Sequence, residues 1–340
     1  MNVKFFCAFL LSSVLFFCNT TFADQLIIEP DMGRAPLLNS INRAKHSIDL
    51  VMYGFTDETL LDALLSKKNH GTDLKVILEP SPYRATDENS DTIALFKKNN
   101  VQWVPGVDNM RLTHQKTLIL DDKQAIVMTF NFTHSSFDAK ASHPQRNFGL
   151  IIDDPRKVRD ILDVFNNDFQ HQRPSMKNDD LIYSPYNSRE KWLQYINQAK
   201  HSIKMYAQSI SDNDIVNALS HAANRGVKIE ILTTDKSKQP VYNELTQSGV
   251  DLEISKHYYI HAKVMMIDDQ VAILGSINLT RASLDDNREL AVVIRDAHII
   301  QQLNDTFLQD WQSSEHKITR RSHQKTFKRQ LHQFIKSMQF

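Results

Sequence analysis

The chain contains a long internal repeat. Residues 41–48 match residues 196–203 at seven of eight positions, at an offset of 155. The match continues more loosely, pairing Asp57 with Asp212 and Gly71 with Gly226. Each copy spans roughly 150 residues, an ordinary size for one domain. We therefore expect two structurally related halves.

Hydrophobic patterning predicts strands that alternate with helices in both halves. Thr56 and Asp57 can cap a helix that ends before Gly71, and Pro155 begins another helix at a position that tolerates proline. Apolar, β-prone runs predict strands at residues 47–55, 74–78, 117–120, 125–128 and 148–152, and in the second half at 202–210, 228–232, 264–267, 271–274 and 290–294. This order predicts the α/β class, with a sandwich of helices and a mixed sheet in each half.

The two ends of the chain differ from the rest. Residues 5–17 are an apolar run after Lys4, and Thr21-Phe22-Ala23 resembles a cleavage site. We therefore expect residues 1–23 to be a secretory signal peptide cut after Ala23, and the protein to be secreted or periplasmic. A membrane anchor is the alternative, although a span needs about 20 apolar residues. Residues 317–340 are a basic tail without acidic residues, either packed on the core or lying on an anionic membrane.

Charge and cysteine content exclude some classes of function. The sequence has 40 basic and 40 acidic side chains, so no global positive field favours a polyanionic partner. Both cysteines, Cys7 and Cys18, lie in the expected signal peptide. The mature chain would therefore have neither a thiol nucleophile nor a thiolate zinc site.

A second repeat carries the chemistry. Residues 261–278 read His-x-Lys-x4-Asp-x6-Gly-Ser-x-Asn, and residues 114–131 repeat the His, Lys, Asp and Asn at the same spacing. Lysine ammonium groups and asparagine amides can hold phosphate oxygens. A neutral imidazole can attack phosphorus, and a protonated one can donate to the leaving oxygen. Two copies in one site would suit cleavage of a phosphodiester through a phosphohistidine.

The spacing adds geometric expectations. A His and a Lys two residues apart on a strand face the same way. The Gly-Ser pair of the second copy would let the backbone approach a phosphate and would add a hydroxyl donor. A metal site is the rival interpretation of the two histidines, but a lysine beside each one would repel a cation. We therefore expect neither a metal nor another cofactor.

The paired motif resembles that of the phospholipase D superfamily, the His-Lys-Asp phosphodiesterases, over about residues 26–313. The resemblance implies two pseudo-symmetric lobes, which we place at residues 24–177 and 178–316, with one active site between them in a monomer. It also implies a metal-independent phosphodiesterase that works in two steps through a phosphohistidine.

The family pattern implies a role for each motif residue. His114 would attack and His261 would protonate the leaving group, with the reverse assignment left open. Asp121 and Asp268 would orient or stabilise the imidazoles, and Glu289 would support one of them. The phosphate would be held by Lys116, Lys263, Thr129, Asn131, Ser276 and Asn278, with Gly275 in a supporting position.

The first copy departs from the pattern at three positions. Met128 replaces glycine, Thr129 replaces serine, and Asn147 stands where Glu289 stands in the second half. We therefore expect an asymmetric site in which one imidazole lacks a carboxylate partner.

Several substrates are compatible with this chemistry. The first hypothesis is a lipid-degrading hydrolase that cleaves phospholipid headgroups at a membrane surface and leaves phosphatidate. It is favoured by the near-neutral charge and by aromatic residues near the motifs, such as Trp103, Tyr258 and Tyr259. The second is a secreted, metal-independent endonuclease acting on nucleic acid, whose basic groove would be lined by Arg111, Lys140, Arg146, Arg281, Arg288 and the tail. The others are a cardiolipin-synthase-like phosphatidyl transferase and a non-catalytic binding module.

Overall fold

A computed structural model of the protein describes residues 24–82, 87–234 and 239–314. The expected signal peptide and the basic tail lie outside these residues, so both remain predictions. Within the described ranges, no helix is long and apolar enough to cross a membrane.

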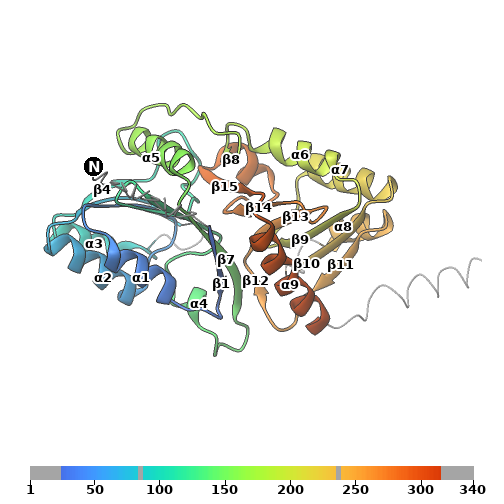
Figure 1. The fold of residues 1–340 in the computed structure, drawn as a ribbon, viewed down its shortest axis with the longest axis horizontal. Helices are drawn as coiled ribbons and strands as arrows, with labels where there is room; N and C mark the ends of the chain where they lie inside the picture. Colours follow the sequence, from blue (N-terminus) through green and yellow to red (C-terminus); the bar gives the residue numbers. More distant parts are fainter. Residues whose placement is uncertain (1–23, 83–86, 235–238, 315–340) are drawn as a thin grey trace, which may run out of the picture.

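Two mixed β-sheets form the framework of the molecule (Figure 1). The first sheet contains, in spatial order, β1 (Gln25–Glu29), β7 (Gln145–Ile152), β6 (Gln124–Met128), β5 (Thr117–Leu120), β2 (Ser47–Met52), β3 (Asp73–Leu78) and β4 (Gln102–Pro105). Strands β2, β3 and β4 run parallel, and the remaining neighbours pair antiparallel.

The second sheet repeats this topology. Its order is β8 (Leu181–Ser184), β15 (Glu289–Ile294), β14 (Val271–Gly275), β13 (Lys263–Ile267), β9 (Ser202–Ala207), β10 (Lys228–Thr233) and β11 (Asp251–Ile254). The directions also match, since β9, β10 and β11 are parallel and the others antiparallel. The predicted α/β class with two related lobes is therefore confirmed.

Helices follow the strands in the same way in both lobes. The first lobe has α1 (Ala35–Arg43), α2 (Glu58–Asn69), α3 (Ser90–Lys98), α4 (His134–Phe137) and α5 (Pro155–Phe169). The second has α6 (Ser188–Gln198), α7 (Asn213–Asn224), α8 (Gln239–Gln247), the π-helix η2 (Ala282–Asp286) and α9 (Ala297–Ser313). The repeated aspartates cap equivalent helices, because Asp57 accepts the N–H of Leu60 and Asp212 accepts that of Ile215.

Apolar side chains cover both faces of each sheet. One buried cluster packs α1, α2 and α3 on the first sheet, and another packs α6, α7 and α8 on the second. A third cluster, the central core, contains residues of both sheets together with α5 and α9. In Figure 1, α5 covers the face of the first sheet opposite α1, α2 and α3, and α9 covers the face of the second sheet opposite α6 and α7. The two lobes therefore share a hydrophobic interior rather than meeting at a polar surface.

Two short parallel pairings also join the lobes. The two-residue strand β12 (Tyr259–Ile260) pairs with Gln145 and Arg146 of β7. Thr113 pairs with Arg288, which precedes β15. In both places the chain that leads into a motif histidine runs beside the other lobe. The structure therefore brings both histidines to the boundary between the lobes.

Candidate active site

The backbone of each motif histidine is held by the opposite lobe. The N–H of His114 donates to the carbonyl of Arg288 at 2.9 Å, and that of His261 donates to the carbonyl of Arg146 at 3.2 Å. These bonds extend the two parallel pairings. They therefore fix the position of the backbone of each histidine relative to the opposite lobe. The two contacts are pseudo-symmetric, like the sheets that they join.

The residue before each histidine is held by its own lobe. The N–H of Thr113 donates to Glu79 Oε2 at 2.7 Å, and that of Ile260 donates to Thr234 Oγ1 at 3.1 Å. Glu79 and Thr234 each follow the second parallel strand of their sheet. The repeat therefore preserves the position of the anchor although its chemistry differs.

Each imidazole has a hydrogen-bond partner from the opposite lobe. His114 Nδ1 lies 2.8 Å from Glu289 Oε2, and His261 Nδ1 lies 2.8 Å from Asn147 Oδ1. Because Nδ1 faces the partner, the Nε2 atom of each ring is left for chemistry. One imidazole has a carboxylate partner and the other an amide, which is the asymmetry that Asn147 led us to expect.

The two motif lysines lie almost entirely inside the protein. Lys116 is 1% exposed and Lys263 is 3% exposed. Lys116 Nζ donates to the carbonyl of His114, and Lys263 Nζ donates to the carbonyl of His261 at 2.5 Å. Backbone carbonyls do not neutralise a buried ammonium group, so a bound anion would stabilise both lysines.

Burial controls the charge of these four side chains. It lowers the pKa of His114 to about 4, although Glu289 acts in the opposite direction. It lowers the pKa of Lys116 to about 7 and lowers the pKa values of His261 and Lys263 well below their usual range. Without a bound anion, both imidazoles are therefore neutral at neutral pH, and a nucleophilic imidazole must be neutral.

Glu289 remains ionised in spite of its burial. Burial raises its pKa, but the attraction and hydrogen bond of His114, with smaller contributions from Lys116 and Asn287, outweigh that effect and lower it. An ionised Glu289 fixes the proton of neutral His114 on Nδ1, so the lone pair is on Nε2.

Two site residues were missed by sequence reasoning. The ring of Tyr53 contacts His114 edge to face at a centroid distance of 4.7 Å, and Lys116 Nζ lies 5.0 Å from its centroid. Glu88 also lies near Lys116 and raises the pKa of that lysine. Tyr53 directly follows β2, and its place at the end of a central strand is the sequence feature that could have indicated a site residue. Glu88 aligns with Asn243 at the 155-residue offset, so the repeat gave no signal for it.

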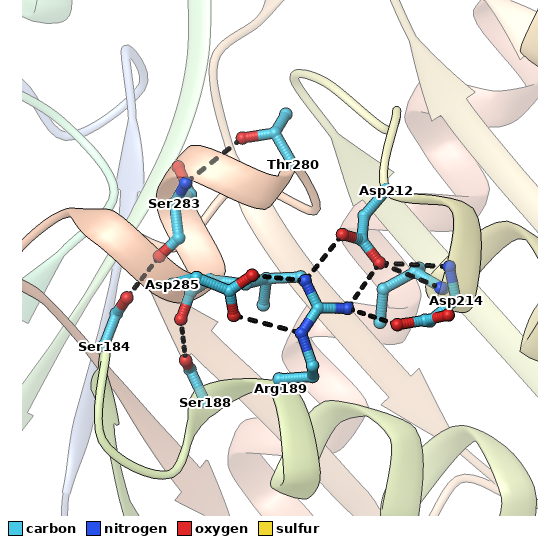
Figure 2. A network of polar contacts seen from close by, with 10 residues as sticks. Ser184, Ser188, Arg189, Asp212, Asp214, Thr280, Ser283 and Asp285 are labelled. Atoms are coloured by element: carbon cyan, nitrogen blue, oxygen red, sulfur yellow. Dashed lines mark hydrogen bonds and ion pairs between the residues drawn. The ribbon is translucent and has the colours of Figure 1, made fainter.

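The segment that delivers Glu289 is anchored by a polar network (Figure 2). Arg189 binds Asp212 of the α7 cap at 2.7 Å and Asp285 of η2 at 2.6 Å. Immediately after η2, Asn287 Nδ2 donates to Glu289 Oε1 at 3.0 Å. The network therefore fixes the short helix from which the chain enters the site.

The family is shown by comparison with known proteins. The model described as cardiolipin synthase, PLD-like domain, matches residues 37–171 and 192–311. The chain belongs to the phospholipase D superfamily. It is 27% identical over 336 residues to cardiolipin synthase 1 of Staphylococcus epidermidis, covering 82% of this chain and 66% of that protein. It is 38% identical over 120 residues to phospholipase D of Rickettsia conorii, covering 34% of this chain and 58% of that protein.

Structural comparison agrees on the fold. Phosphatidylserine synthase of Haemophilus influenzae Rd KW20 superposes with a TM-score of 0.66 at 12% identity, covering 86% of this chain and 87% of that one. At this identity the likeness concerns the fold alone. The chain spans slightly less than two thirds of the length of the staphylococcal cardiolipin synthase that it matches.

The aspartates of the superfamily motif do not reach the histidines, so the role predicted for them is wrong. Asp121 accepts the backbone N–H groups of Lys45, His46 and Ser47, at 2.6 to 3.0 Å. Asp268 makes the same contacts with residues 200–202. Each aspartate directly follows a strand, β5 or β13, that begins a few residues after the motif histidine. The aspartate and the histidine therefore lie at opposite ends of that strand. These aspartates fasten the start of the central strand.

The predicted roles of three other superfamily positions are also wrong. Ser276 Oγ is buried and accepts the N–H of Leu290, so it is turned toward β15 and not toward a phosphate. Thr129 Oγ1 accepts the equivalent N–H, that of Phe148, at 2.9 Å. A Cβ on Gly275 would lie 2.2 Å from the carbonyl oxygen of Leu290. This glycine therefore permits close packing of two strands rather than approach to a ligand.

The Met128 replacement is compensated by its neighbour on the sheet. Met128 pairs with Gly149 across β6 and β7, whereas Gly275 pairs with Ala291 across β14 and β15. The glycine of this pair therefore stands on β7 in the first lobe and on β14 in the second.

The two motif asparagines lie at the site, each with a buried Oδ1 atom that has no hydrogen-bond partner in the described residues. Asn278 lines a small cavity together with Lys263 and Gln208. Asn131 lies beside Gly54, where an added Cβ would meet both Asn131 Cγ at 3.4 Å and Glu88 Oε1 at 3.3 Å. Their role in holding phosphate remains a prediction.

Two arginines that were expected to line a basic groove are instead buried. Arg146 is 3% exposed and makes a bidentate ion pair with Asp310 of α9 at 2.8 and 3.0 Å. Arg288 is fully buried and binds Asp168 of α5 at 2.8 Å. Both pairs cross between the lobes, so these arginines hold the lobes together and cannot contact a nucleic-acid backbone.

Metal ligands were also sought among the residues that the structure describes. In residues 24–82, 87–234 and 239–314, no group of three or more His, Cys, Asp or Glu side chains is arranged to hold a metal ion. Metal independence of the reaction itself remains a prediction.

Proposed function

We propose that the protein is a phospholipase D-type phosphodiesterase that hydrolyses the headgroup phosphodiester of phospholipids and yields phosphatidate. The observation that carries this proposal is the meeting of two His-Lys pairs from opposite lobes, with His114 bonded to the buried carboxylate of Glu289. Two buried ammonium groups favour an anionic ligand, and the free Nε2 of a neutral imidazole provides a nucleophile.

In the first step, His114 Nε2 attacks phosphorus. The bond from phosphorus to the headgroup oxygen breaks, and His261, whose protonated form the bound phosphate anion favours, gives its Nε2 proton to that oxygen. Glu289 accepts the Nδ1 proton of His114 in a hydrogen bond and stabilises the positive charge that the ring gains on phosphorylation. Asn147 offers no charge to His261, so this ring is the better proton donor.

In the second step, neutral His261 takes a proton from water. The water oxygen bonds to phosphorus, the bond from phosphorus to His114 breaks, and phosphatidate leaves. The proton that His261 has gained restores the protonated acid for the next cycle. His114 returns to its neutral form with Nδ1 still bonded to Glu289.

Three observations support a phospholipid substrate. Arg146 and Arg288 are withdrawn from any basic groove, which weakens the case for an endonuclease. Tyr259 is 42% exposed and its ring stacks at 6.4 Å from that of His261, so an amphipathic aromatic surface lies beside the site. The sequence relatives named above are called cardiolipin synthase and phospholipase D, and both names refer to phospholipid reactions.

Phosphatidyl transfer is the second candidate function. It would use the same first step, but an alcohol would replace water as the acceptor. The observation that favours it is the match to cardiolipin synthase over most of this chain. Addition of glycerol to the assay separates the two, since a transferase would form phosphatidylglycerol in preference to phosphatidate.

The test uses purified residues 24–340 on mixed phospholipid vesicles and on plasmid DNA, both in chelator. We expect headgroup release from the vesicles and loss of that release in His114→Asn and His261→Asn. DNA cleavage without lipid turnover would overturn the phospholipid proposal in favour of the endonuclease. The absence of turnover on both substrates would instead favour the hypothesis of a non-catalytic binding module. Export to the periplasm or medium, monomeric state and membrane contact are part of the same proposal.

A further inference from the structure

The two departures Thr129 and Asn147 are in direct contact. Thr129 Oγ1 lies 2.9 Å from Asn147 Oδ1, and both side chains are fully buried. The hydroxyl oxygen already accepts the N–H of Phe148 at 2.9 Å. Its proton is therefore available for the amide oxygen, and no solvent competes for it. The second half lacks this contact, because Ser276 Oγ bonds the backbone of Leu290.

The Thr129 hydroxyl determines which end of the Asn147 amide faces His261. Asn147 Oδ1 receives the Thr129 proton and lies 2.8 Å from His261 Nδ1. Asn147 Nδ2 then points to Gln145 Oε1 at 3.4 Å. A flipped amide would leave the buried Thr129 proton without an acceptor and would lose the Gln145 contact. Two independent contacts therefore favour the same orientation.

We propose that Thr129 is a positioning residue for His261, acting through Asn147. With the amide oxygen toward Nδ1, the proton of neutral His261 lies on Nδ1 and the lone pair on Nε2. This tautomer can take a proton from the acceptor water or alcohol in the second step. A flipped amide would present Nδ2 as a donor to Nδ1 and force the proton onto Nε2, where it blocks that role.

This inference rests on the proposed function and explains how an amide can replace a carboxylate. A carboxylate accepts through either oxygen, so Glu289 needs no orienting hydroxyl. An amide accepts a hydrogen bond only through its oxygen, so Asn147 needs a hydroxyl that orients it. Threonine at 129 and asparagine at 147 therefore form one coupled replacement rather than two independent losses.

The kinetic test is a double-mutant cycle on the chain from residue 24 to 340. Thr129→Val removes the hydroxyl and keeps the shape, whereas Thr129→Ser keeps the hydroxyl. We expect Thr129→Val to slow breakdown of the phosphohistidine about tenfold, equivalent to about 1.4 kcal/mol, so that the intermediate accumulates. Thr129→Ser is expected to resemble the unmodified chain. In the Asn147→Asp background, Thr129→Val is expected to have little effect, because aspartate needs no orientation.

A purely structural role for Thr129 predicts a different result. Thr129→Val would then lower the rate by the same factor with Asn147 and with Asp at position 147, and that outcome would overturn the inference. Ser276→Ala is the matched control, since it removes the equivalent buried hydroxyl without touching a histidine partner. We expect it to cause no accumulation of the intermediate.

The tautomer can be read without turnover. Nitrogen-15 NMR of histidine-labelled protein is expected to show His261 protonated on Nδ1 in the unmodified chain and on Nε2 in Thr129→Val. An Nε2 proton in the unmodified chain would overturn the inference, whether or not any variant folds. If the protein turns over no phospholipid but shows the expected tautomers, the proposed function fails and the positioning role of Thr129 stands.

Discussion

The partner of Nδ1 is what distinguishes the two histidines at the residue scale. His114 faces an ionised carboxylate and His261 faces an amide. A carboxylate stabilises the cationic ring of a phosphohistidine, and a neutral amide does so less. The environment therefore favours His114 as the nucleophile and His261 as the proton carrier, although the two motifs are related by a repeat.

The activity should depend on pH through His114 on the acid side, and through Lys116 and the proton donor His261 on the alkaline side. His114, whose pKa is about 4, must be neutral to attack, so kcat/KM should fall as the pH falls through 4. Lys116, whose pKa is about 7, must be charged to hold phosphate, so kcat/KM should fall as the pH rises through 7. In kcat the alkaline limb should lie higher, because bound phosphate favours the charged lysine. A rate on a soluble phosphodiester that increases from pH 7 to 9 would contradict this charge assignment.

Glu289 should be essential to the first step. Glu289→Gln removes the charge that stabilises the His114 imidazolium, and we expect the headgroup burst to slow roughly 10²- to 10⁴-fold. Glu230→Gln is the control, because Glu230 is also buried but its carboxylate binds Lys228 and not a histidine. Equal bursts in Glu289→Gln and in the unmodified chain would show that the carboxylate does not assist the attack.

The chemistry of single residues could be predicted where the motif is duplicated. Two His-x-Lys copies indicated which imidazoles and ammonium groups belong together. The role of Asp121 could not be predicted in the same way, since its partners lie more than 70 residues away in the sequence. Those partners, Lys45, His46 and Ser47, lie within the best-preserved part of the repeat. Similarity there reflects a backbone anchor and not the active site.

At the element scale, the close approach of β14 and β15 should be sensitive to substitution. A Cβ at Gly275 would meet the backbone of Leu290 and Ala291 at 2.2 and 2.4 Å. We expect Gly275→Ala to lower the free energy of unfolding by about 1–3 kcal/mol, measured in denaturant.

Gly149 provides the matched comparison in the other lobe. A Cβ there would meet the side chains of Met128 and Phe130 at 3.3 Å. Side-chain ends can move aside, so Gly149→Ala should cost less than about 1 kcal/mol. A larger loss for Gly149→Ala than for Gly275→Ala would contradict the assignment of Gly275 to strand packing.

Strands could be predicted where apolar residues form a continuous run. The central strands β2, β3, β9 and β10 lie within the predicted ranges or extend them by one residue. Strand β12 could not be predicted, because it has only two residues and exists through pairing with a distant strand. The sequence also did not predict that the glycine stands on a different strand in each lobe. That finding depends on knowing that Met128 pairs with Gly149 in the sheet.

At the scale of the whole molecule, the two lobes depend on each other for the site. Each histidine takes its backbone anchor and its Nδ1 partner from the opposite lobe. Buried Arg-Asp pairs cross the boundary in both directions, from β7 to α9 and from the segment before β15 to α5. The repeat predicted the lobes, but these reciprocal contacts needed the three-dimensional arrangement.

Breaking one of these pairs should destabilise the whole protein. Asp168→Asn leaves the Arg288 guanidinium buried without a counter-charge, and we expect a loss of about 3–5 kcal/mol in the free energy of unfolding. Replacing both partners, as Arg288→Met with Asp168→Leu, should cost less, because no buried charge is left unpaired. Equal losses for the single and the double variant would contradict the assignment of a charge-based link between the lobes.

The central claim is that His114 carries the covalent intermediate. The direct measurement is a single-turnover reaction with a phosphate-labelled phospholipid, stopped by denaturation and followed by sequencing of the labelled peptide. We predict label on the peptide that contains His114, and no labelled peptide in His114→Asn. Label on the peptide that contains His261 would contradict the account.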